Sequence, residues 1–389
     1  MRIAILNHYA DPPLGGKYLR HFHFAKKLIA RGHSVHIFTA STLHGTDKNV
    51  SVKDAEFDGV PYHFVRVPRY RSTKSRLYNM AMYTWKLPGR VYAEGLFDVL
   101  YVSSPHPFIY YAANRIRKRT GAKLVMEIRD LWPETFVSMG AYSKRNLFVR
   151  AFYHLEDRIF RGADELIFTM PGGADYLKER GYDRPSTNLN NGVDLVEFDK
   201  LAKNPSQLPD GNFRVVYTGA FGRVNGLEVL IDAANALADE AIDFYLYGSG
   251  DEEEALTARA KSSRIHFMGR VEKSEIPAIL KSSDLNVFTA APIDLYRYGM
   301  SFNKLFEYLA AGVPILSNLK TRYDILSEEN AGMTVAPGDA EAFRDGILAF
   351  YRMDEEAYRT YGENARAAAV QYDFEVLTDI LEEVLRRSL

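Results

Sequence analysis

The sequence predicts an α/β protein with two doubly wound domains. Its 389 residues exceed one small core and suit two domains of ordinary size. Strand patterns alternate with helix-length segments, and the alternation starts again after a polar, proline-containing stretch at residues 203–212. We predict one domain over residues 1–190 and a second over 191–370. A C-terminal helix within 371–389 could pack on either domain, including back on the first.

The first domain is predicted to open with a βαβ unit. Segments 2–9 (RIAILNHY) and 33–40 (HSVHIFTA) are short apolar runs typical of buried strands. The helical pattern between them covers residues 17–31 and stops at Gly32. Further strands are predicted near residues 61–67, 98–103, 122–128 and 163–169. Helix-length segments lie between most of these strands, which favours an open α/β layer structure.

The second domain repeats this order of elements. The predicted strands are FRVVYTG, DFYLYGSG, RIHFMG, LNVFTA and VPILSN, which begin at residues 213, 243, 264, 285 and 313. Helices are predicted from about residue 225, at residues 302–311 and near residues 374–387. The two halves therefore share an architecture, although no residue-level repeat relates them.

Composition excludes several classes of protein. A formal net charge of −1 argues against a general nucleic-acid binder. The chain has no cysteine, which excludes disulfides, thiolate metal sites and a cysteine nucleophile. The first residues hold too short an apolar run for a signal peptide, and no later stretch approaches the roughly 18 apolar residues of a spanning helix. We expect a cytoplasmic protein that is soluble or only touches a membrane.

Glycines follow several predicted strands, where doubly wound proteins bind their ligands. Gly15 and Gly16 open the first helix, and Gly219 and Gly248 follow strands of the second domain. Glycine allows close approach of the backbone to a ligand, and free N–H groups at a helix start suit an anion. A flexible turn is the alternative for Gly15 and Gly16, because the dinucleotide fingerprint is missing.

Lys304 stands where a helix normally disfavours a cation. It lies in the first turn of helix 302–311, with Glu307 one turn later. A helix N-terminus carries partial positive charge, and lysine before glutamate is the less favourable order of the two charges. A phosphate bound there would make the position favourable and leave Glu307 free to accept hydrogen bonds from sugar hydroxyls. The alternative is a solvated polar face.

Together, several motifs resemble glycosyltransferase family 4, whose members are retaining nucleotide-sugar transferases. They are NGVD at 191–194 with Phe198, the glycine-rich turns, GxG at 248–250 and NKLFEYLAAGVPIL at 303–316. RDLWPE at 129–134 is most similar to bacterial members that build O-antigen, capsule and other exopolysaccharides. The resemblance spans almost the whole chain. It implies the GT-B fold, in which two Rossmann-like domains face a central cleft.

The resemblance also implies roles for residues of the second domain. Glu307 matches the second acid of the family's Glu-x7-Glu motif, which binds the donor ribose, whereas the first acid is replaced by Gly299. A diphosphate clamp of Arg and Lys is usual in the first loop of this domain. Because Asn225 precedes Gly226 here, Arg223 and Lys304 are expected to supply these charges. The remaining expected donor-site residues are Gly15, Gly16, Gly219, Gly248, Arg270, Ser301, Phe302, Asn303 and Leu305.

In the first domain, the resemblance directs attention to the loop after strand 122–128. Arg129 occupies the place of a histidine that family members often carry near the donor sugar. Asp130 and Glu134 then become candidates for contact with the acceptor or the sugar, with Asp130 also a catalytic candidate. Strand-end and helix-cap roles are the alternative for both. His106, at a strand end, is retained as a further acceptor-side candidate.

The chemistry implied by the family needs neither a metal nor a protein nucleophile. No Asp-x-Asp motif is present, so no metal is expected to bind the diphosphate. Arg223, Lys304 and helix N-termini would stabilise the leaving diphosphate, which itself would take the acceptor proton. We expect a nucleotide-sugar co-substrate, with UDP favoured, a glycan or polyprenyl-diphosphate-linked acceptor, and no nucleic acid.

Three other functions are alternatives to a glycosyltransferase. A nucleotide-sugar epimerase of the same fold would use the same donor without an acceptor. A two-domain extracytoplasmic binding protein is disfavoured by the missing signal peptide, and a nicotinamide-dependent oxidoreductase by the missing fingerprint.

A basic segment predicts contact with the inner face of a membrane. Residues 59–93 contain no acid but many cations, interleaved with tyrosine, methionine and Trp85. Cations and aromatic residues are what an interfacial segment needs. The alternative is an ordinary helix with solvated basic residues. The residues predicted to touch the membrane are Arg69, Arg71, Lys74, Arg76 and Trp85.

Overall fold

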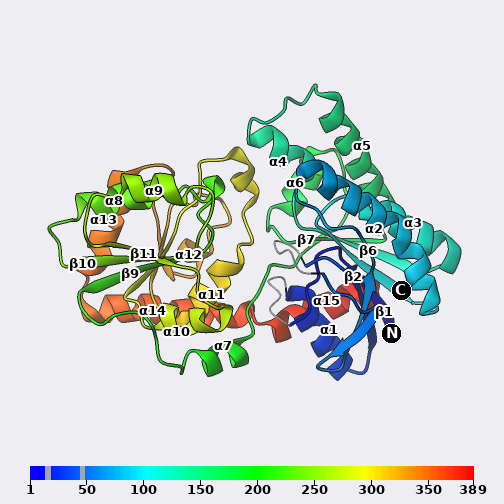
Figure 1. Ribbon diagram of the computed structural model, residues 1–389, viewed down its shortest axis with the longest axis horizontal. Coiled ribbons are helices and arrows are strands. Elements are labelled where there is room, and N and C mark those ends of the chain that lie inside the picture. Colours follow the sequence, from blue (N-terminus) through cyan, green and yellow to red (C-terminus); the bar gives the residue numbers. More distant parts are fainter. Residues whose placement is uncertain (14–18, 44–48) are drawn as a thin grey trace. The chain divides into compact units, whose positions relative to one another are not determined.

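The computed structural model describes residues 1–13, 19–43 and 49–389, which form two compact units. The first unit comprises Met1–Asn190 together with Phe374–Leu389, and the second comprises Asn191–Asp373. Each unit is an α/β structure with a central sheet (Figure 1). Among the described residues, no helix has the length and apolar character needed to cross a bilayer.

The first unit contains a sheet of eight strands in the order β3-β4-β2-β1-β5-β6-β7-β8. All neighbouring strands are parallel except β3 and β4. The strands are β1 (Arg2–Leu6), β2 (Ser34–Ala40), β3 (Asp54–Phe57), β4 (Val60–Val65), β5 (Val99–Ser104), β6 (Lys123–Ile128), β7 (Glu165–Phe168) and β8 (Thr187–Asn188). The helices are α1 (Arg20–Ala30), α2 (Thr73–Ala93), α3 (Ile109–Thr120), α4 (Trp132–Ser138), α5 (Leu147–Gly162), α6 (Gly173–Glu179) and α15 (Phe374–Arg387).

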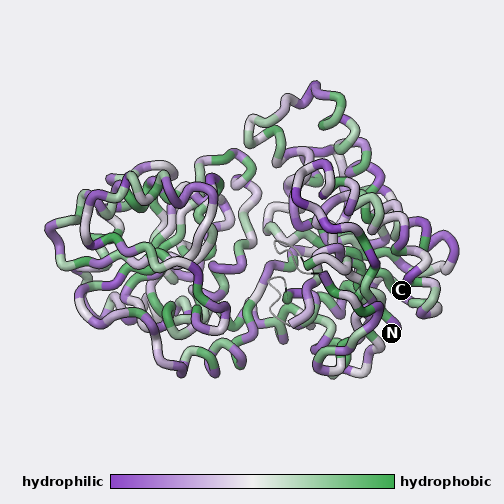
Figure 2. Tube along the Cα trace, viewed as in Figure 1, coloured by the Kyte–Doolittle hydropathy of each residue, from purple (hydrophilic) through white to green (hydrophobic). Residues whose placement is uncertain are grey.

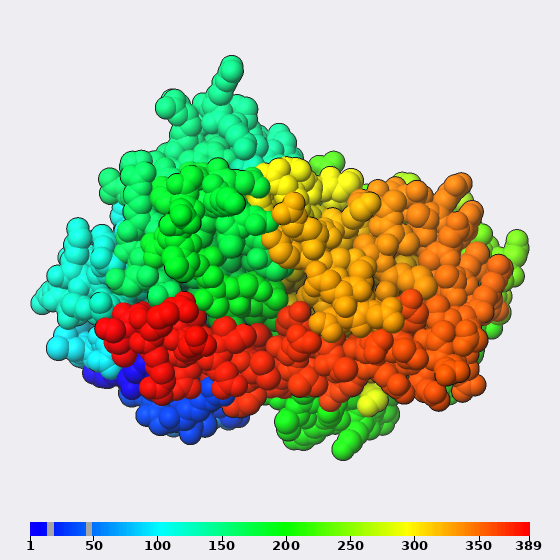
Figure 3. All heavy atoms as spheres, turned by 180° about the vertical axis from the view of Figure 1, so that it is seen from behind, coloured from blue at the N-terminus to red at the C-terminus, as the bar shows by residue number. Residues whose placement is uncertain are grey.

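Helix α15, from the end of the chain, belongs to the core of this first unit. Its buried Leu377, Leu381 and Leu385 share a hydrophobic cluster with Phe24 and Leu28 of α1. Ion pairs of Arg31 with Glu375, Asp379 and Glu382 hold the same two helices together at the surface. Figure 3 shows red α15 beside the blue N-terminal segment.

The second unit contains a sheet of six parallel strands in the order β11-β10-β9-β12-β13-β14. The strands are β9 (Phe213–Thr218), β10 (Ile242–Tyr247), β11 (Ile265–Gly269), β12 (Leu285–Phe288), β13 (Ile315–Ser317) and β14 (Gly332–Thr334). The α-helices are α7 (Leu195–Leu201), α8 (Glu228–Ala236), α9 (Glu253–Arg259), α10 (Ile276–Lys281), α11 (Asn303–Ala311), α12 (Ile325–Glu328), α13 (Ala340–Tyr351) and α14 (Glu355–Gln371). Short 3₁₀ helices are η1 (Arg223–Asn225), η2 (Lys273–Glu275) and η3 (Asp294–Tyr298).

These strand orders confirm the predicted doubly wound α/β fold. In both units the first strand has its successor on one side and a later strand on the other. Such a reversal of strand order is where doubly wound sheets bind ligands, at the carboxyl ends of the strands. Hydrophobic and hydrophilic stretches alternate along the helices, as expected for elements with one buried face (Figure 2).

Small differences from the predicted elements have local causes. The helix expected from residue 225 begins at Glu228, because η1 and the left-handed Gly226 (φ +56°) precede it. The helix expected at 302–311 is α11, and it ends at Gly312 with φ +67°. Strands β3, β8 and β14 were not expected, since each has four residues or fewer and shows little periodicity.

Candidate active site

Two glycines bring the strand ends of the second unit close together. Gly219 follows β9 with φ +151°, and a Cβ atom there would lie 3.0 Å from Lys304 Nζ and 2.9 Å from Tyr217 Oη. Gly248 follows β10 with φ +152°, and its Cβ atom would overlap the carbonyl oxygen of Gly219. Gly219 therefore permits close packing around the Lys304 ammonium group, and Gly248 permits close approach of the backbone at Gly219.

Lys304 is surrounded by neutral oxygen atoms. Its Nζ donates to Tyr217 Oη over 3.1 Å and to Asn225 Oδ1 over 3.3 Å, and it lies 4.5 Å from the centre of the Tyr217 ring. Tyr217 and Asn225 both donate to the carbonyl oxygen of Ala220 over 2.9 Å, which fixes their positions. Burial lowers the pKa of Lys304 to about 7. A bound anion would supply the negative charge that these neutral partners lack.

At Asn225 the chain differs from the family's usual diphosphate clamp of Arg and Lys. The resemblance implies a basic residue in the first loop of this domain, where Asn225 precedes Gly226. The structure brings the ammonium group of Lys304, from another element, against the Asn225 side chain. Arg223 lies two residues earlier in η1, with an exposed side chain. The sequence singled out these residues, but it gave no signal that Tyr217 would complete the group.

The start of α11 has features that suit an anion. Its first turn contains no acid, and its N-cap residue, Phe302, provides no side-chain hydrogen bond. Asn191 holds the preceding loop, because its backbone N–H donates to Ser301 Oγ over 2.7 Å and its side-chain amide donates to the Ser301 carbonyl oxygen over 2.5 Å. Asn191 is the first residue of the NGVD motif, whose sequence contains no signal for this pair. Asn303 is exposed at the first position of the helix.

Glu307 has one charged neighbour within 4 Å among the residues that the structure describes. Its carboxylate, with 21% of the side chain exposed, lies 3.9 Å from Lys273 Nζ. Burial raises the pKa of Glu307, although Lys273 opposes this effect. Gly299, at the position of the family's first acid, adopts φ +74° and ψ 174°, a conformation that residues with a Cβ atom rarely adopt. The loop geometry therefore gives a physical reason for the missing acid.

The other residues expected at the donor site differ in whether the side chain or only the backbone is accessible to a ligand. Arg270 follows β11 and donates to Ser249 Oγ, between Gly248 and Gly250. Phe302 lies near two other aromatic rings, and Leu305 is 5% exposed within the hydrophobic core. Only the backbone of Leu305 is therefore available to a ligand. Gly15 and Gly16 lie outside the described residues.

The acceptor-side candidates follow strands of the first unit. Arg129 and Asp130 come directly after β6, and Thr169 Oγ1 donates to the Arg129 carbonyl oxygen over 3.2 Å. Glu134 is buried, accepts a hydrogen bond from Tyr153 Oη over 2.5 Å and pairs with Lys144 over 3.2 Å. Its carboxylate thus joins α4 to α5.

His106 is fully buried after β5. Its Nε2 lies 2.8 Å from Nδ1 of His8, which follows β1 and is also fully buried. Burial lowers the pKa of His106 to about 3, so its imidazole is neutral near pH 7. This placement makes His106 a packing residue of the first unit rather than an exposed acceptor contact.

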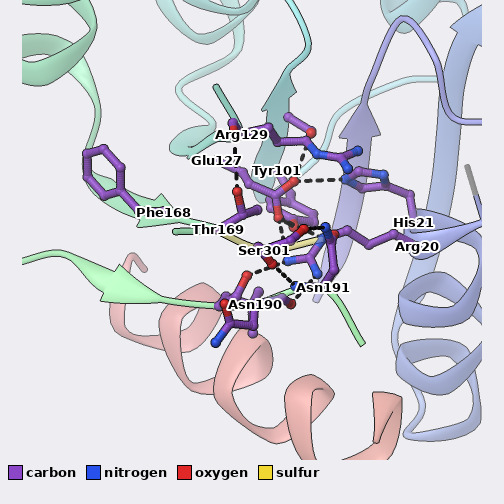
Figure 4. A network of polar contacts seen from close by, with 12 residues as sticks. Arg20, His21, Tyr101, Glu127, Arg129, Phe168, Thr169, Asn190, Asn191 and Ser301 are labelled. Atoms are coloured by element: carbon purple, nitrogen blue, oxygen red, sulfur yellow. Dashed lines mark hydrogen bonds and ion pairs between the residues drawn. The ribbon is translucent and has the colours of Figure 1, made fainter. Parts of the chain in front are cut away.

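A buried carboxylate that sequence analysis missed lies in β6. Glu127 is fully buried and accepts hydrogen bonds from Tyr101 Oη and, over 2.8 Å, from both Ser103 Oγ and Arg20 Nη2 (Figure 4). Although burial opposes ionisation, Arg20 and then His21 hold the pKa of Glu127 well below its usual range. Arg20 also donates to the carbonyl oxygens of Leu189, over 2.8 Å, and Asn190. The sequence does contain a signal for this buried carboxylate, which is a single acid within the apolar strand KLVMEI.

The predicted membrane residues do not all face solvent. Arg69, Arg71 and Lys74 are exposed, and Trp85 on α2 is 68% exposed. Arg76 is partly buried, however, because its Nε donates to Tyr9 Oη over 3.2 Å and its guanidinium lies over the Tyr9 ring.

One group of first-unit side chains offers three atoms of metal-ligand type within 4.8 Å of one another. These are His36, His63 and Glu94. Arg90 already pairs with Glu94 and lies 2.9 Å from His63 Nδ1, and His63 Nε2 lies 2.9 Å from His36 Nδ1. The guanidinium charge and this hydrogen bonding disfavour a cation at the group.

Comparison with known proteins places this geometry in a family. The model described as a glycosyl transferase 4-like domain matches residues 17–190, and that described as glycosyl transferases group 1 matches residues 212–353. The probable glycosyltransferase WbjE of Pseudomonas aeruginosa is 23% identical over 58% of this chain and 59% of that protein. The putative colanic acid biosynthesis glycosyl transferase WcaI of Escherichia coli is 22% identical over 74% of this chain and 76% of its own length.

Solved structures share the fold at low sequence identity. Sucrose-phosphate synthase of Thermosynechococcus elongatus has a TM-score of 0.77 and 18% identity, covering 99% of this chain and 98% of that one. Anabaena HepE in complex with UDP and glucose has a TM-score of 0.70 and 18% identity, with complete coverage of both chains. These likenesses confirm the predicted GT-B fold. Because one family model covers most of the first unit and the other most of the second, the chain belongs to the group 1, family 4-like glycosyltransferases.

Proposed function

We propose that this glycosyltransferase moves a sugar from a UDP-sugar to a glycan or polyprenyl-diphosphate-linked acceptor, in the synthesis of a bacterial surface polysaccharide. The observation that carries the donor proposal is Lys304, a partly buried ammonium group held by neutral oxygens where the strand order reverses. The UDP complex of HepE supports the choice of nucleotide. The name of WcaI supports the choice of pathway.

In the proposed donor complex, the diphosphate is bound by Lys304 and the free N–H groups at the start of α11. Arg223, exposed in η1, stabilises the charge that develops as the diphosphate leaves. Glu307 accepts hydrogen bonds from the ribose hydroxyls, and Lys273 opposes the effect of burial, which raises the pKa of its carboxyl group. Loop contacts from Arg270, Ser301 and Asn303 complete the donor site.

The proposed transfer retains the configuration of the sugar and uses no metal. The acceptor oxygen bonds to the anomeric carbon on the same face from which the diphosphate leaves, and the bond between that carbon and the phosphate oxygen breaks. The leaving phosphate takes the proton of the acceptor hydroxyl, so this reaction needs neither a protein nucleophile nor a protein base. Arg129 and Asp130 remain our acceptor-side residues, since both lie at the carboxyl end of β6. Glu134 and His106 are withdrawn from this role because their side chains are engaged inside the first unit.

Titration with UDP tests the donor site. Lys304→Met and Glu307→Ala should each weaken UDP binding about 10- to 100-fold, as expected for loss of a charge-assisted hydrogen bond. Lys281→Met removes an exposed lysine of α10 and should bind UDP like the wild type. Wild-type affinity in both site variants would refute the donor site. Arg223→Ala should lower kcat more than it weakens UDP binding, because the charge it meets develops in the transition state.

A further inference from the structure

A group of large apolar side chains on the first unit is exposed to solvent. They come from α2, α3, α5 and the segment between α4 and α5. Four of them, Leu77, Trp85, Tyr111 and Phe148, are between 41% and 68% exposed. The other four, Tyr78, Met139, Tyr142 and Leu147, are between 47% and 79% exposed. Exposed apolar side chains gathered in this way usually mark a binding surface. We call these eight residues the apolar patch.

A groove runs through this patch. It has a volume of about 530 Å³ and lies between α2 and α3, with Phe148 of α5 at its edge. Leu77, Ala81, Trp85 and Pro88 line it from α2, spaced so that they share one face of the helix. Phe108, Tyr111, Ala112 and Arg115 line it from the other side. Both walls are therefore mainly apolar.

The chain segments that carry the patch contain cations but no acids. The three segments that form it, residues 69–93, 105–121 and 135–155, contain no aspartate or glutamate. Their exposed cations include Arg69, Arg71, Lys74, Arg115, Lys118, Arg145 and Arg150. An apolar face with aromatic side chains and a cationic border matches an anionic lipid surface, where rings lie at the headgroup level and cations contact the headgroups.

We propose that the apolar patch docks the protein on an anionic lipid bilayer, with an acyl chain in the groove. A single bound hydrocarbon chain does not account for the surface, because four of the eight apolar side chains lie outside the groove lining. A bilayer would also contact exposed apolar side chains outside the groove and neutralise the surrounding cations. This surface extends the prediction made from the basic segment 59–93, because it adds residues of α3 and α5. It omits Arg76, which is hydrogen-bonded to Tyr9.

The patch adjoins the proposed acceptor side of the same unit. Phe108 of the groove lies 5.4 Å from Phe152, and Phe152 stacks on Trp132 at 5.5 Å, as measured between ring centres. Trp132 Nε1 donates to the Pro105 carbonyl oxygen over 3.1 Å, and Trp132 follows Arg129 and Asp130 by only a few residues. Docking would hold this loop near the lipid surface. This point rests on the proposed function, whereas lipid binding does not.

Flotation with vesicles tests the proposal on the full chain. One set of vesicles contains phosphatidylcholine alone, and the other an equimolar mixture with phosphatidylglycerol. The wild type should bind the mixed vesicles more than tenfold better at low salt, and added salt should weaken this binding. Arg69→Gln, Arg71→Gln and Lys74→Gln should each reduce binding about fivefold. Lys281→Gln, on the second unit, should not change it.

Separate variants test how much the apolar side chains contribute to lipid binding. Leu147→Ser should weaken binding to the mixed vesicles, whereas Val196→Ser, at a second-unit site of similar exposure, should leave it unchanged. The chain has two tryptophans, so Trp85→Phe identifies the emission of Trp85. Vesicles should shift the wild-type emission to shorter wavelength, and this shift should be absent in Trp85→Phe.

Three results would overturn the proposal. The first is no binding to mixed vesicles at low salt. The second is equal loss of binding in the patch variants and in their second-unit controls. The third is a Trp85 emission shift with a soluble short-chain prenyl phosphate but none with vesicles, which would make the groove a single-chain site. UDP affinity, measured in parallel, should be unchanged in every patch variant, so failure of the donor proposal would be seen separately.

Discussion

Two buried or partly buried cations, one in each unit, have opposite surroundings. Arg20 is 5% exposed and pairs with the fully buried carboxylate of Glu127, and it also donates to two backbone carbonyl oxygens. Lys304 donates to a phenol and an amide oxygen. Among the residues described by the structure, no carboxylate lies within ion-pair distance of Lys304.

The difference separates a structural charge from a functional one. A buried charge is costly unless another charge and hydrogen bonds compensate it. Arg20 has its compensation inside the protein, so it contributes to the folded structure and needs no ligand. Lys304 lacks an anionic partner, and its lowered pKa reflects that cost. We infer that the compensation for Lys304 is the diphosphate of the donor.

The largest expected effect is on stability. Glu127→Gln should lower the free energy of unfolding by roughly 3–5 kcal/mol, because it leaves Arg20 buried without its counter-charge. Lys304→Met should leave the free energy of unfolding unchanged or raise it, since no ion pair is lost. Urea unfolding at constant pH measures both. The double variant Arg20→Met with Glu127→Leu should be more stable than Glu127→Gln. Equal destabilisation by Glu127→Gln and Lys304→Met would remove the distinction between the two cations.

The next effect concerns pH. Because the pKa of Lys304 is lowered from 10.5 to about 7, the unfolded chain binds more protons than the folded protein between these values. Lys304 therefore makes the free energy of unfolding rise with pH across that window. The destabilisation that comes from burying its charge is fully present below pH 7. Diphosphate binding should restore the ammonium charge, so UDP binding at pH 8 should take up nearly one proton.

Calorimetry in two buffers of different ionisation enthalpy measures that uptake. The affinity for UDP should fall as pH rises above 7, by at most about tenfold per pH unit. Lys304→Arg is the matched control, because guanidinium stays charged over this range and should show no uptake. An unchanged uptake in Lys304→Arg would assign the proton to another group.

The smallest effect concerns Gly299. Gly299→Ala should cost about 1–3 kcal/mol of stability, because φ +74° with ψ 174° lies in a region that is essentially confined to glycine. Gly299→Glu, which restores the acid of the family motif, should cost a similar amount and give no gain in UDP affinity. Thermal unfolding and UDP titration measure the two effects. A tighter complex with UDP in Gly299→Glu would show that the loop can accommodate the acid.

The fold and the family could be predicted from the sequence, and both are confirmed. The apolar runs of the long parallel strands and the glycine that ends α11 are local signals, so they are visible without a structure. The short edge strands β3, β8 and β14 escaped prediction because pairing with neighbours, rather than their own pattern, defines them. The residues of the donor and acceptor sites remain predictions that the proposed binding experiments test.

The sequence by itself determined that Lys304 sits unfavourably in its helix and that Glu307 follows one turn later, because helical spacing is a local property. Only the tertiary structure decided what surrounds these charges. Tyr217 and Asn225 reach Lys304 across 87 and 79 residues of chain, and Arg20 reaches Glu127 across 107. Packing of distant elements sets such partners, and partners decide whether a buried cation is already neutralised or still able to bind an anion.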